Sequence, residues 1–118
     1  MPRISPLVSV IILNWNGKKF LHDCLTSLST IASPRIEIIV VDNNSSDDSV
    51  SYMGKNFPKV KVIVSDKNNG FARGNNIGAG VARGQYLLFL NNDTKVTKDF
   101  LLPMIVSCKR DPHIGCVQ

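Results

Sequence analysis

Short apolar runs alternate along the chain with segments of helical periodicity. Strands are predicted over residues 7–13, 36–41, 60–64 and 84–91, and a fifth is predicted at 114–117. Between them, apolar residues recur at helical spacing over residues 18–29, 47–56, 75–82 and 100–110. This alternation predicts one α/β domain, residues 1–118, in which a mostly parallel sheet is sandwiched by helices.

The strand and loop patterns add detail to this prediction. Residues 84–91 are almost continuously apolar, which predicts a strand buried on both faces. Residues 60–64 alternate valine or isoleucine with Lys61, which predicts a strand at a sheet edge. The polar segment 66–74 contains two glycines and is expected to be a loop, and Ser45 or Ser46 is expected to cap the helix over 47–56.

Polar side chains follow three of the apolar strands. Asn14 ends the first, Asp42 ends the second, and Asn91, Asn92 and Asp93 end the fourth. Ligands of open α/β sheets bind just outside the carboxyl ends of the strands. We therefore expect these amides and two carboxylates to share one cleft.

Asp93 is the first candidate for chemistry. An oxygen-rich strand end with a single carboxylate suits Mg²⁺ or Mn²⁺, because a substrate diphosphate and water can supply the other ligands. The alternative is that Asp93 caps a turn or a helix. Sequence patterns of the phosphate-loop and dinucleotide-fingerprint types are not found.

Asp42 also has two interpretations. Its carboxylate can accept a hydrogen bond from a ligand N–H, such as the imide of uracil or thymine. It can equally close an Asx-turn with residues 43–46, which carry amide and hydroxyl side chains.

Composition and charge narrow the partners. The 118 residues carry a formal net charge of +5, but the basic residues are scattered, so we expect an anionic small molecule and no nucleic acid. The three cysteines, Cys24, Cys108 and Cys116, are expected to be small core residues of a reducing compartment. No apolar run approaches the ~20 residues of a membrane span. We expect a cytoplasmic protein, whose positive charge would allow attachment to acidic lipids at the inner face of a membrane.

Four ordered motifs resemble those of family 2 glycosyltransferases, and the resemblance covers nearly the whole chain. They are Val8–Asn16, Glu37–Asp47, Asn68–Gly78 and Gly84–Asp93. The resemblance implies the GT-A fold of nucleotide-diphospho-sugar transferases, of which this chain is the Rossmann-like, nucleotide-binding half. It implies that Asp93 holds the metal and that the nucleotide is contacted by Leu13, Asn14, Trp15, Asp42, Asn68, Gly70, Arg73, Asn75, Asn91 and Asn92.

The function implied by this resemblance is metal-dependent transfer, with inversion, of a sugar from a UDP or dTDP donor to a saccharide or lipid-linked acceptor, as in synthesis of cell-wall or surface polysaccharide. Many family members carry aspartate at the positions of Asn91 and Asn92, and the form found here is similar to a bacterial rhamnosyltransferase-like branch. The catalytic base and acceptor site are expected in a carboxyl-terminal half that has no counterpart here. The chain is therefore expected to be a fragment that is inactive alone, and the alternative is a non-catalytic module that binds nucleotide sugars.

Overall fold

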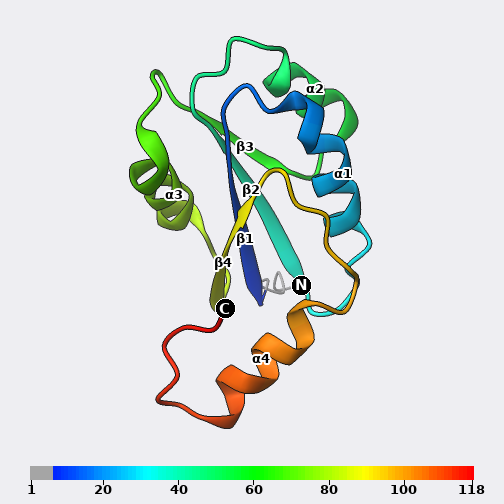
Figure 1. The fold of residues 1–118 in the computed structure, drawn as a ribbon, viewed down its shortest axis with the longest axis vertical. Coiled ribbons are helices and arrows are strands. Elements are labelled where there is room, and N and C mark those ends of the chain that lie inside the picture. The colour runs from blue at the N-terminus through cyan, green and yellow to red at the C-terminus, as the bar shows by residue number, and fades with distance from the viewer. Residues whose placement is uncertain (1–6) are drawn as a thin grey trace, which may run out of the picture.

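The computed structural model describes residues 7–118, which form one layered α/β unit (Figure 1). The elements follow in the order β1 (Val8–Asn14), α1 (Lys18–Ser29), β2 (Ile36–Asp42), α2 (Ser49–Asn56), β3 (Lys61–Val64), α3 (Gly70–Val81), β4 (Tyr86–Asn91) and α4 (Leu101–Arg110). The four strands form one sheet in the order β3-β2-β1-β4, and all three pairings are parallel. The predicted α/β class and parallel sheet are confirmed.

The sheet is covered by helices on both faces. α3 packs on β1 and β2 from one side, while α1 and α2 lie on the other side (Figure 1). The main core lies on the α1 side, where Val10 and Ile12 of β1 meet Leu21 and Leu25 of α1, all fully buried. Leu101 and Ile105 of α4 join the same core.

Small residues allow α3 to approach the sheet closely. A Cβ at Gly78 would lie 2.6 Å from Ile11 Cγ2, and one at Gly74 would lie 2.4 Å from Leu13 Cδ1. The buried face of α3 therefore consists of Gly74, Asn75 and Gly78 and not of large apolar side chains.

Two strand predictions were wrong. β4 is an edge of the sheet and not a strand buried on both faces: Leu87 and Phe89 are 46% and 50% exposed. The reason is that α3 covers β1 and β2, and no described helix covers the same face of β4. Residues 114–117 form no strand, and Cys116 is exposed there, whereas Cys24 is buried as expected.

Two helix starts also differ from the prediction. α3 begins at Gly70, so the loop ends at residue 69, because the small residues of the buried face gave no apolar periodicity. α2 begins at Ser49, and its first N–H donates to Asp47 Oδ1 at 3.0 Å. Neither Ser45 nor Ser46 caps it, because Asp48 stands at the N-cap position, Ser45 is bonded to Asp42 and Ser46 is bonded to Asn16. The predicted edge position of β3 is confirmed.

No helix among residues 7–118 combines the length and the apolar character needed to cross a membrane.

Candidate functional site at the carboxyl edge of the sheet

The carboxyl ends of β1, β2 and β4 lie at one edge of the sheet. In the strand registers Asn14 stands opposite Asp42, and Leu13 stands opposite Asn91. The order β3-β2-β1-β4 reverses direction between β1 and β4, which is the topological switch point where α/β sheets bind ligands. The structure therefore confirms that Asn14, Asp42 and Asn91 lie at one edge of the sheet, and a cleft shared by them stays a prediction.

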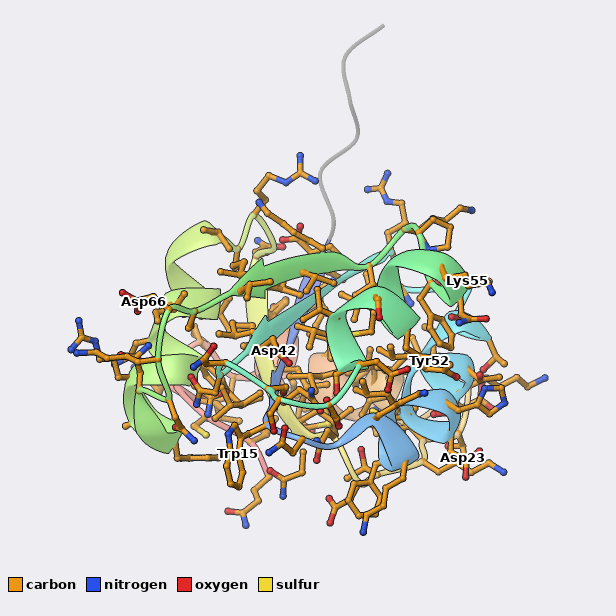
Figure 2. All side chains as sticks on the ribbon, turned by 90° about the horizontal axis from the view of Figure 1, so that it is seen from above. Trp15, Asp23, Asp42, Tyr52, Lys55 and Asp66 are labelled. Atoms are coloured by element: carbon orange, nitrogen blue, oxygen red, sulfur yellow. The ribbon has the colours of Figure 1, made fainter. Side chains whose placement is uncertain are left out.

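Asp42 is fully buried and strongly hydrogen-bonded. Its Oδ1 accepts from Asn14 Nδ2 at 2.9 Å and from the Ser45 hydroxyl at 2.7 Å, and its Oδ2 accepts from the Ser45 N–H at 2.8 Å. Asp42 therefore closes the turn after β2 through the N–H and hydroxyl of Ser45, three residues on, and not through the N–H two residues on that defines an Asx-turn. Figure 2 shows Asp42 in the interior, seen from above the strand ends.

Asn14 links the ends of three strands. It is fully buried, donates to Asp42 on β2, and accepts from Asn92 Nδ2 at 2.9 Å just beyond β4. Gly17 leaves the space for this pair, because a Cβ there would lie 2.3 Å from Asn92 Nδ2. Asn14 and Asn92 therefore tie the end of β4 to the ends of β1 and β2.

Asp93 has a different environment from Asp42. It is exposed in the turn that follows β4, and among residues 7–118 its carboxylate forms no hydrogen bond or ion pair. The turn itself is held by the Thr94 hydroxyl, which donates to the Asn91 carbonyl at 2.7 Å. Asp93 is therefore a carboxylate on a fixed turn with its acceptor capacity unused.

These donors fit a hard divalent cation. One unpaired carboxylate beside amide oxygens is the partial ligand set that Mg²⁺ accepts when a diphosphate and water complete the shell. Within the described part of the chain, no group of three or more His, Cys, Asp or Glu side chains is placed to hold a metal by itself. Asp93 is the residue that would hold such an ion.

The sulfur of Cys24 packs beneath this turn, 3.9 Å from Thr94 Oγ1. Burial raises the pKa of the Cys24 thiol, and the hydrogen bonds from Thr94 offset only part of that rise. Cys24 therefore supports the turn as a neutral group.

The loop before α3 is tied to the same edge by Asn43, which the sequence did not single out. Asn43 is 2% exposed; its Oδ1 accepts from the Asn69 N–H at 3.3 Å and its Nδ2 donates to the Gly70 carbonyl at 3.1 Å. Gly70 has φ +77°, a conformation that favours glycine. The sequence signal was present in the run of amides after β2, but that run could not show which of them would face the loop.

The other predicted residues of this loop have separate environments. Asn68 accepts from the Gly70 N–H at 2.9 Å, and Arg73 is exposed on α3. Asn75 is 8% exposed and donates to the Phe71 carbonyl at 3.0 Å. Asn75 is therefore engaged within α3, whereas Arg73 faces solvent.

The loops after β1 and β2 are joined by Asn16, a second residue that sequence reasoning did not assign. Its Oδ1 accepts from the backbone N–H groups of Ser46 at 2.7 Å and Asp47 at 3.2 Å.

Burial alone would raise the pKa of Asp47, but hydrogen bonds from Ser49 and from the Lys18 N–H outweigh that effect, and the pKa of Asp47 is lowered. Trp15, 57% exposed, stands at the margin of the edge (Figure 2).

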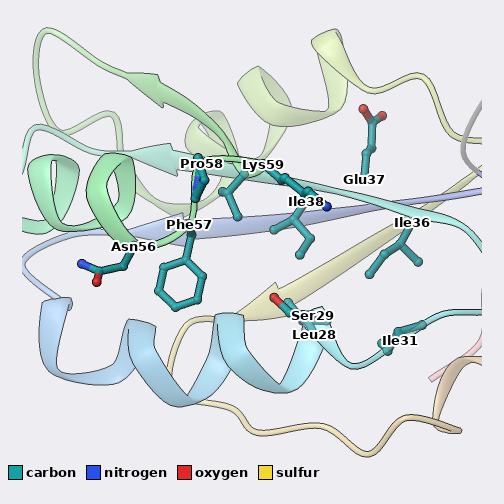
Figure 3. Close-up of a pocket in the computed structure, with 11 residues that line it drawn as sticks. Leu28, Ser29, Ile31, Ile36, Glu37, Ile38, Asn56, Phe57, Pro58 and Lys59 are labelled. Atoms are coloured by element: carbon teal, nitrogen blue, oxygen red, sulfur yellow. The ribbon is translucent and has the colours of Figure 1, made fainter.

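A separate hollow of about 580 Å³ lies elsewhere, beside the amino-terminal half of β2 (Figure 3). Apolar side chains line most of it, among them Leu28, Ile36, Ile38 and Phe57. Its carboxylate, Glu37, points to the opposite side of β2 from Ile36 and Ile38 (Figure 3). Ser29, Asn56 and Lys59 also line this hollow, but none of the strand-end residues Asn14, Asp42 and Asp93 does.

Comparison with known proteins places the chain beside glycosyltransferases. Residues 9–118 match the model of the family described as glycosyl transferase family 2. The putative teichuronic acid biosynthesis glycosyltransferase TuaG of Bacillus subtilis is 33% identical over 104 residues, which are 86% of this chain and 41% of TuaG.

Solved structures show the same fold. Staphylococcus aureus TarS, residues 1–349, superimposes with a TM-score of 0.77 at 27% identity, over 87% of this chain and 32% of that one. TarS has also been solved in complex with UDP-GlcNAc. A mannosyltransferase of Pyrobaculum calidifontis, in complex with GDP-Man and Mn²⁺, has a TM-score of 0.77 at 24% identity and shares the fold over 98% of this chain and 36% of its own. The chain thus spans between about a third and two-fifths of TuaG, of TarS residues 1–349 and of the mannosyltransferase chain.

Proposed function

Because the chain belongs to glycosyl transferase family 2, we propose that it binds the nucleoside-diphosphate part of a sugar donor at the carboxyl edge of its sheet. The observation that carries this proposal is the convergence of Asn14, Asp42 and the turn Asn91–Asp93 at the switch point of the sheet. At one end of that edge Asp42 is a buried carboxylate fixed by hydrogen bonds, and at the other end Asp93 is an exposed carboxylate.

In this proposal Asp42 recognises the base. A carboxylate has about four acceptor positions, and the hydrogen bonds from Asn14 and Ser45 use three of those on Asp42. One position is left for the imide N–H of a pyrimidine, which favours UDP or dTDP donors. Leu13, Asn14, Trp15 and the loop Asn68–Arg73 with Asn75 would surround the base and ribose.

The diphosphate would lie toward the turn after β4. Asp93 would hold Mg²⁺ or Mn²⁺ there, and the ion, when bound, supplies Lewis-acid stabilisation of the charge on the departing diphosphate. The protein contributes a turn already fixed by Thr94, so that Asp93 needs little reorganisation to bind. The presence of Mn²⁺ in the mannosyltransferase complex supports a metal in this fold.

The complete reaction is proposed to be sugar transfer with inversion to a saccharide or lipid-linked acceptor. The name of TuaG and the UDP-GlcNAc complex of TarS support a role in surface polysaccharide synthesis and a uridine nucleotide donor. The base that deprotonates the acceptor hydroxyl is expected in a part of the protein beyond the matched third. Location in the cytoplasm, at the inner face of a membrane, stays a prediction.

A thermal-shift panel tests the donor class. UDP, dTDP, GDP and CDP are compared with and without Mn²⁺, since a ligand that binds only the folded chain raises its unfolding midpoint. We expect the largest rise with UDP or dTDP, and only when Mn²⁺ is present. Equal shifts for all four nucleotides, or none, would overturn the proposal.

A nucleotide-sugar-binding module without transfer activity is the second candidate. The observation that favours it is that the described ends of β1, β2 and β4 carry two carboxylates, Asp42 and Asp93, and both have roles in donor binding. Donor consumption with candidate acceptors separates the two: sustained turnover would exclude the module.

A further inference from the structure

Two amides and a carboxylate form a directed chain of hydrogen bonds across the ends of three strands. Asn92 Nδ2 donates to Asn14 Oδ1 at 2.9 Å, and Asn14 Nδ2 donates to Asp42 Oδ1 at 2.9 Å. Asn14 is fully buried and is the central member of this chain of hydrogen bonds. Every bond therefore points from β4 toward β2.

The direction of this chain is fixed by Asp42. An ionised carboxylate only accepts hydrogen bonds, so Asn14 must turn its NH₂ toward Asp42 and its oxygen toward residue 92. Asp42 cannot rotate away, because both of its oxygens accept hydrogen bonds from Ser45. Residue 92 must then donate, which asparagine does and ionised aspartate does not.

The backbone around Asn92 closes this arrangement. A Cβ at Gly17 would lie 2.3 Å from Asn92 Nδ2 and 2.5 Å from Asn14 Oδ1, so the loop after β1 presses directly on the pair. Exchange of Asn92 for aspartate would place two acceptors face to face in a confined space, and a buried unpaired acceptor is costly.

We propose that Asn14 and Asn92 are positioning residues, and that the amide of Asn92 holds Asn14 and does not contact the nucleotide. The proposal rests on the proposed function, since what the pair positions is the base-recognising Asp42 relative to the turn that carries Asp93. It also explains why residue 92 of this protein is asparagine. Because Asn14 donates to Asp42, the oxygen of Asn14 faces residue 92, and that residue must supply a hydrogen-bond donor.

Exchange of the carboxylate at position 42 with the amide at position 92 tests the direction of the hydrogen-bond chain. Asn92→Asp alone sets a carboxylate oxygen against the oxygen of Asn14, and Asn14 cannot reverse while Asp42 needs its NH₂. In the double variant D42N/N92D, the new amide at position 42 can donate to Asn14, and Asn14 can reverse and donate to the new carboxylate at position 92, with the net charge unchanged. We expect N92D to lower the thermal unfolding midpoint by roughly 4–8 °C, and the double variant to regain part of that loss.

Asn91→Asp is the matched control, because it makes the same change of amide to carboxylate at the neighbouring exposed residue. Its unfolding midpoint should stay near that of the wild type. If the double variant is no more stable than N92D, or if N91D loses as much as N92D, the directed chain is overturned.

A second measurement asks whether Asn92 touches the nucleotide. In the NMR spectrum of the ¹⁵N-labelled chain, the Asn92 side-chain NH₂ should exchange slowly with water, and it should stay protected when UDP and Mg²⁺ shift the resonances of residues around Asp42 and Asp93. Loss of that protection, or a large shift of the Asn92 NH₂ on addition of UDP, would show a ligand contact and overturn the positioning role. If UDP shifts no resonance at all, the proposed function fails, while the swap experiment still decides the hydrogen-bond chain.

Discussion

Asp42 and Asp93 differ in how much of their hydrogen-bonding capacity the protein already uses. Asp42 is buried and accepts three hydrogen bonds, whereas Asp93 is exposed and has no partner among residues 7–118. We therefore expect substitution of Asp42 to change both the stability of the fold and nucleotide binding, and substitution of Asp93 to change nucleotide binding alone.

Asp93→Ala should abolish the effect of Mn²⁺ on UDP or dTDP binding and leave the free energy of unfolding within about 0.5 kcal/mol of the wild type, as is usual for surface sites. Isothermal calorimetry with and without Mn²⁺ measures the first, and urea unfolding the second. Asp99→Ala, another exposed carboxylate of the same segment, is the control. Equal stimulation by Mn²⁺ in Asp93→Ala and the wild type would contradict the assignment.

Asp42→Ala should lower the affinity for UDP roughly ten- to more than a hundredfold, because a charge-assisted hydrogen bond to the base is lost. It should also destabilise the fold by roughly 1–3 kcal/mol, since donors on Asn14 and Ser45 lose their acceptor. Asp66→Ala, an exposed carboxylate after β3, carries the same change of charge without these contacts. An unchanged preference for pyrimidine over purine diphosphates would show that Asp42 only closes its turn.

Among the secondary-structure elements, α3 depends on small residues and not on an apolar stripe. Gly78→Ala should destabilise the protein by roughly 1–3 kcal/mol despite the better helix propensity of alanine, because the new methyl group would overlap Ile11. A Cβ at Gly80 in the same helix would meet no atom of another element within 4 Å, so Gly80→Ala should be neutral or stabilising. Thermal unfolding of both variants checks the packing, and equal losses would contradict it.

Glu37 joins β2, β1 and the connection before β4. It accepts from the Ser9 hydroxyl at 2.5 Å and from the Arg83 N–H at 2.6 Å, with the Arg83 guanidinium 3.5 Å away. Burial would raise the pKa of Glu37, but these hydrogen bonds and the positive charge outweigh it and the pKa is lowered. A lowered folded-state pKa stabilises the protein above the unfolded value near 4.3, and that stabilisation is lost as the pH falls through the folded value.

Glu37→Gln should therefore cost roughly 1–2 kcal/mol at pH 7, and the difference from the wild type should shrink as the pH falls below the unfolded value near 4.3. Urea unfolding at pH 7 and at an acidic pH below that value measures the difference. Asp23→Asn, an exposed site with the same carboxylate-to-amide change, should show no such trend. If the loss of stability in Glu37→Gln does not depend on pH, the charge of Glu37 does not contribute to the stability of the fold.

Sequence patterns predicted most elements because their apolar spacing is local. They failed where burial depends on distant packing: Leu87 and Phe89 have the composition of a central strand, but the position of α3 leaves them exposed. The strand-end residues Asn14, Asp42 and Asn91 could be placed together because parallel strands share one edge. That the side chain of residue 92 turns inward could not be predicted, because it depends on the space that the glycine after β1 leaves.

For the whole molecule, the chain matches about a third to two-fifths of the length of longer glycosyltransferase chains, and we propose that this part binds the donor. Transfer needs a held donor, a stabilised leaving group and a base with an acceptor pocket, and loss of a general base alone typically costs about 10²–10⁴ in rate. The 118-residue chain should therefore bind UDP or dTDP with Mn²⁺, weakly, and consume donor only at background rate. Robust turnover would contradict this, and would place a base among residues assigned otherwise.

Binding of a nucleoside diphosphate at the carboxyl edge of the sheet is the claim on which the other assignments depend. Titration of the ¹⁵N-labelled chain with UDP and Mg²⁺ tests it most directly, because every backbone amide reports on its own surroundings. We predict shifts confined to residues 13–17, 42–46, 68–75 and 91–94. Shifts centred instead on the hollow lined by Leu28, Ile36 and Phe57, or no shifts at saturating UDP, would contradict it.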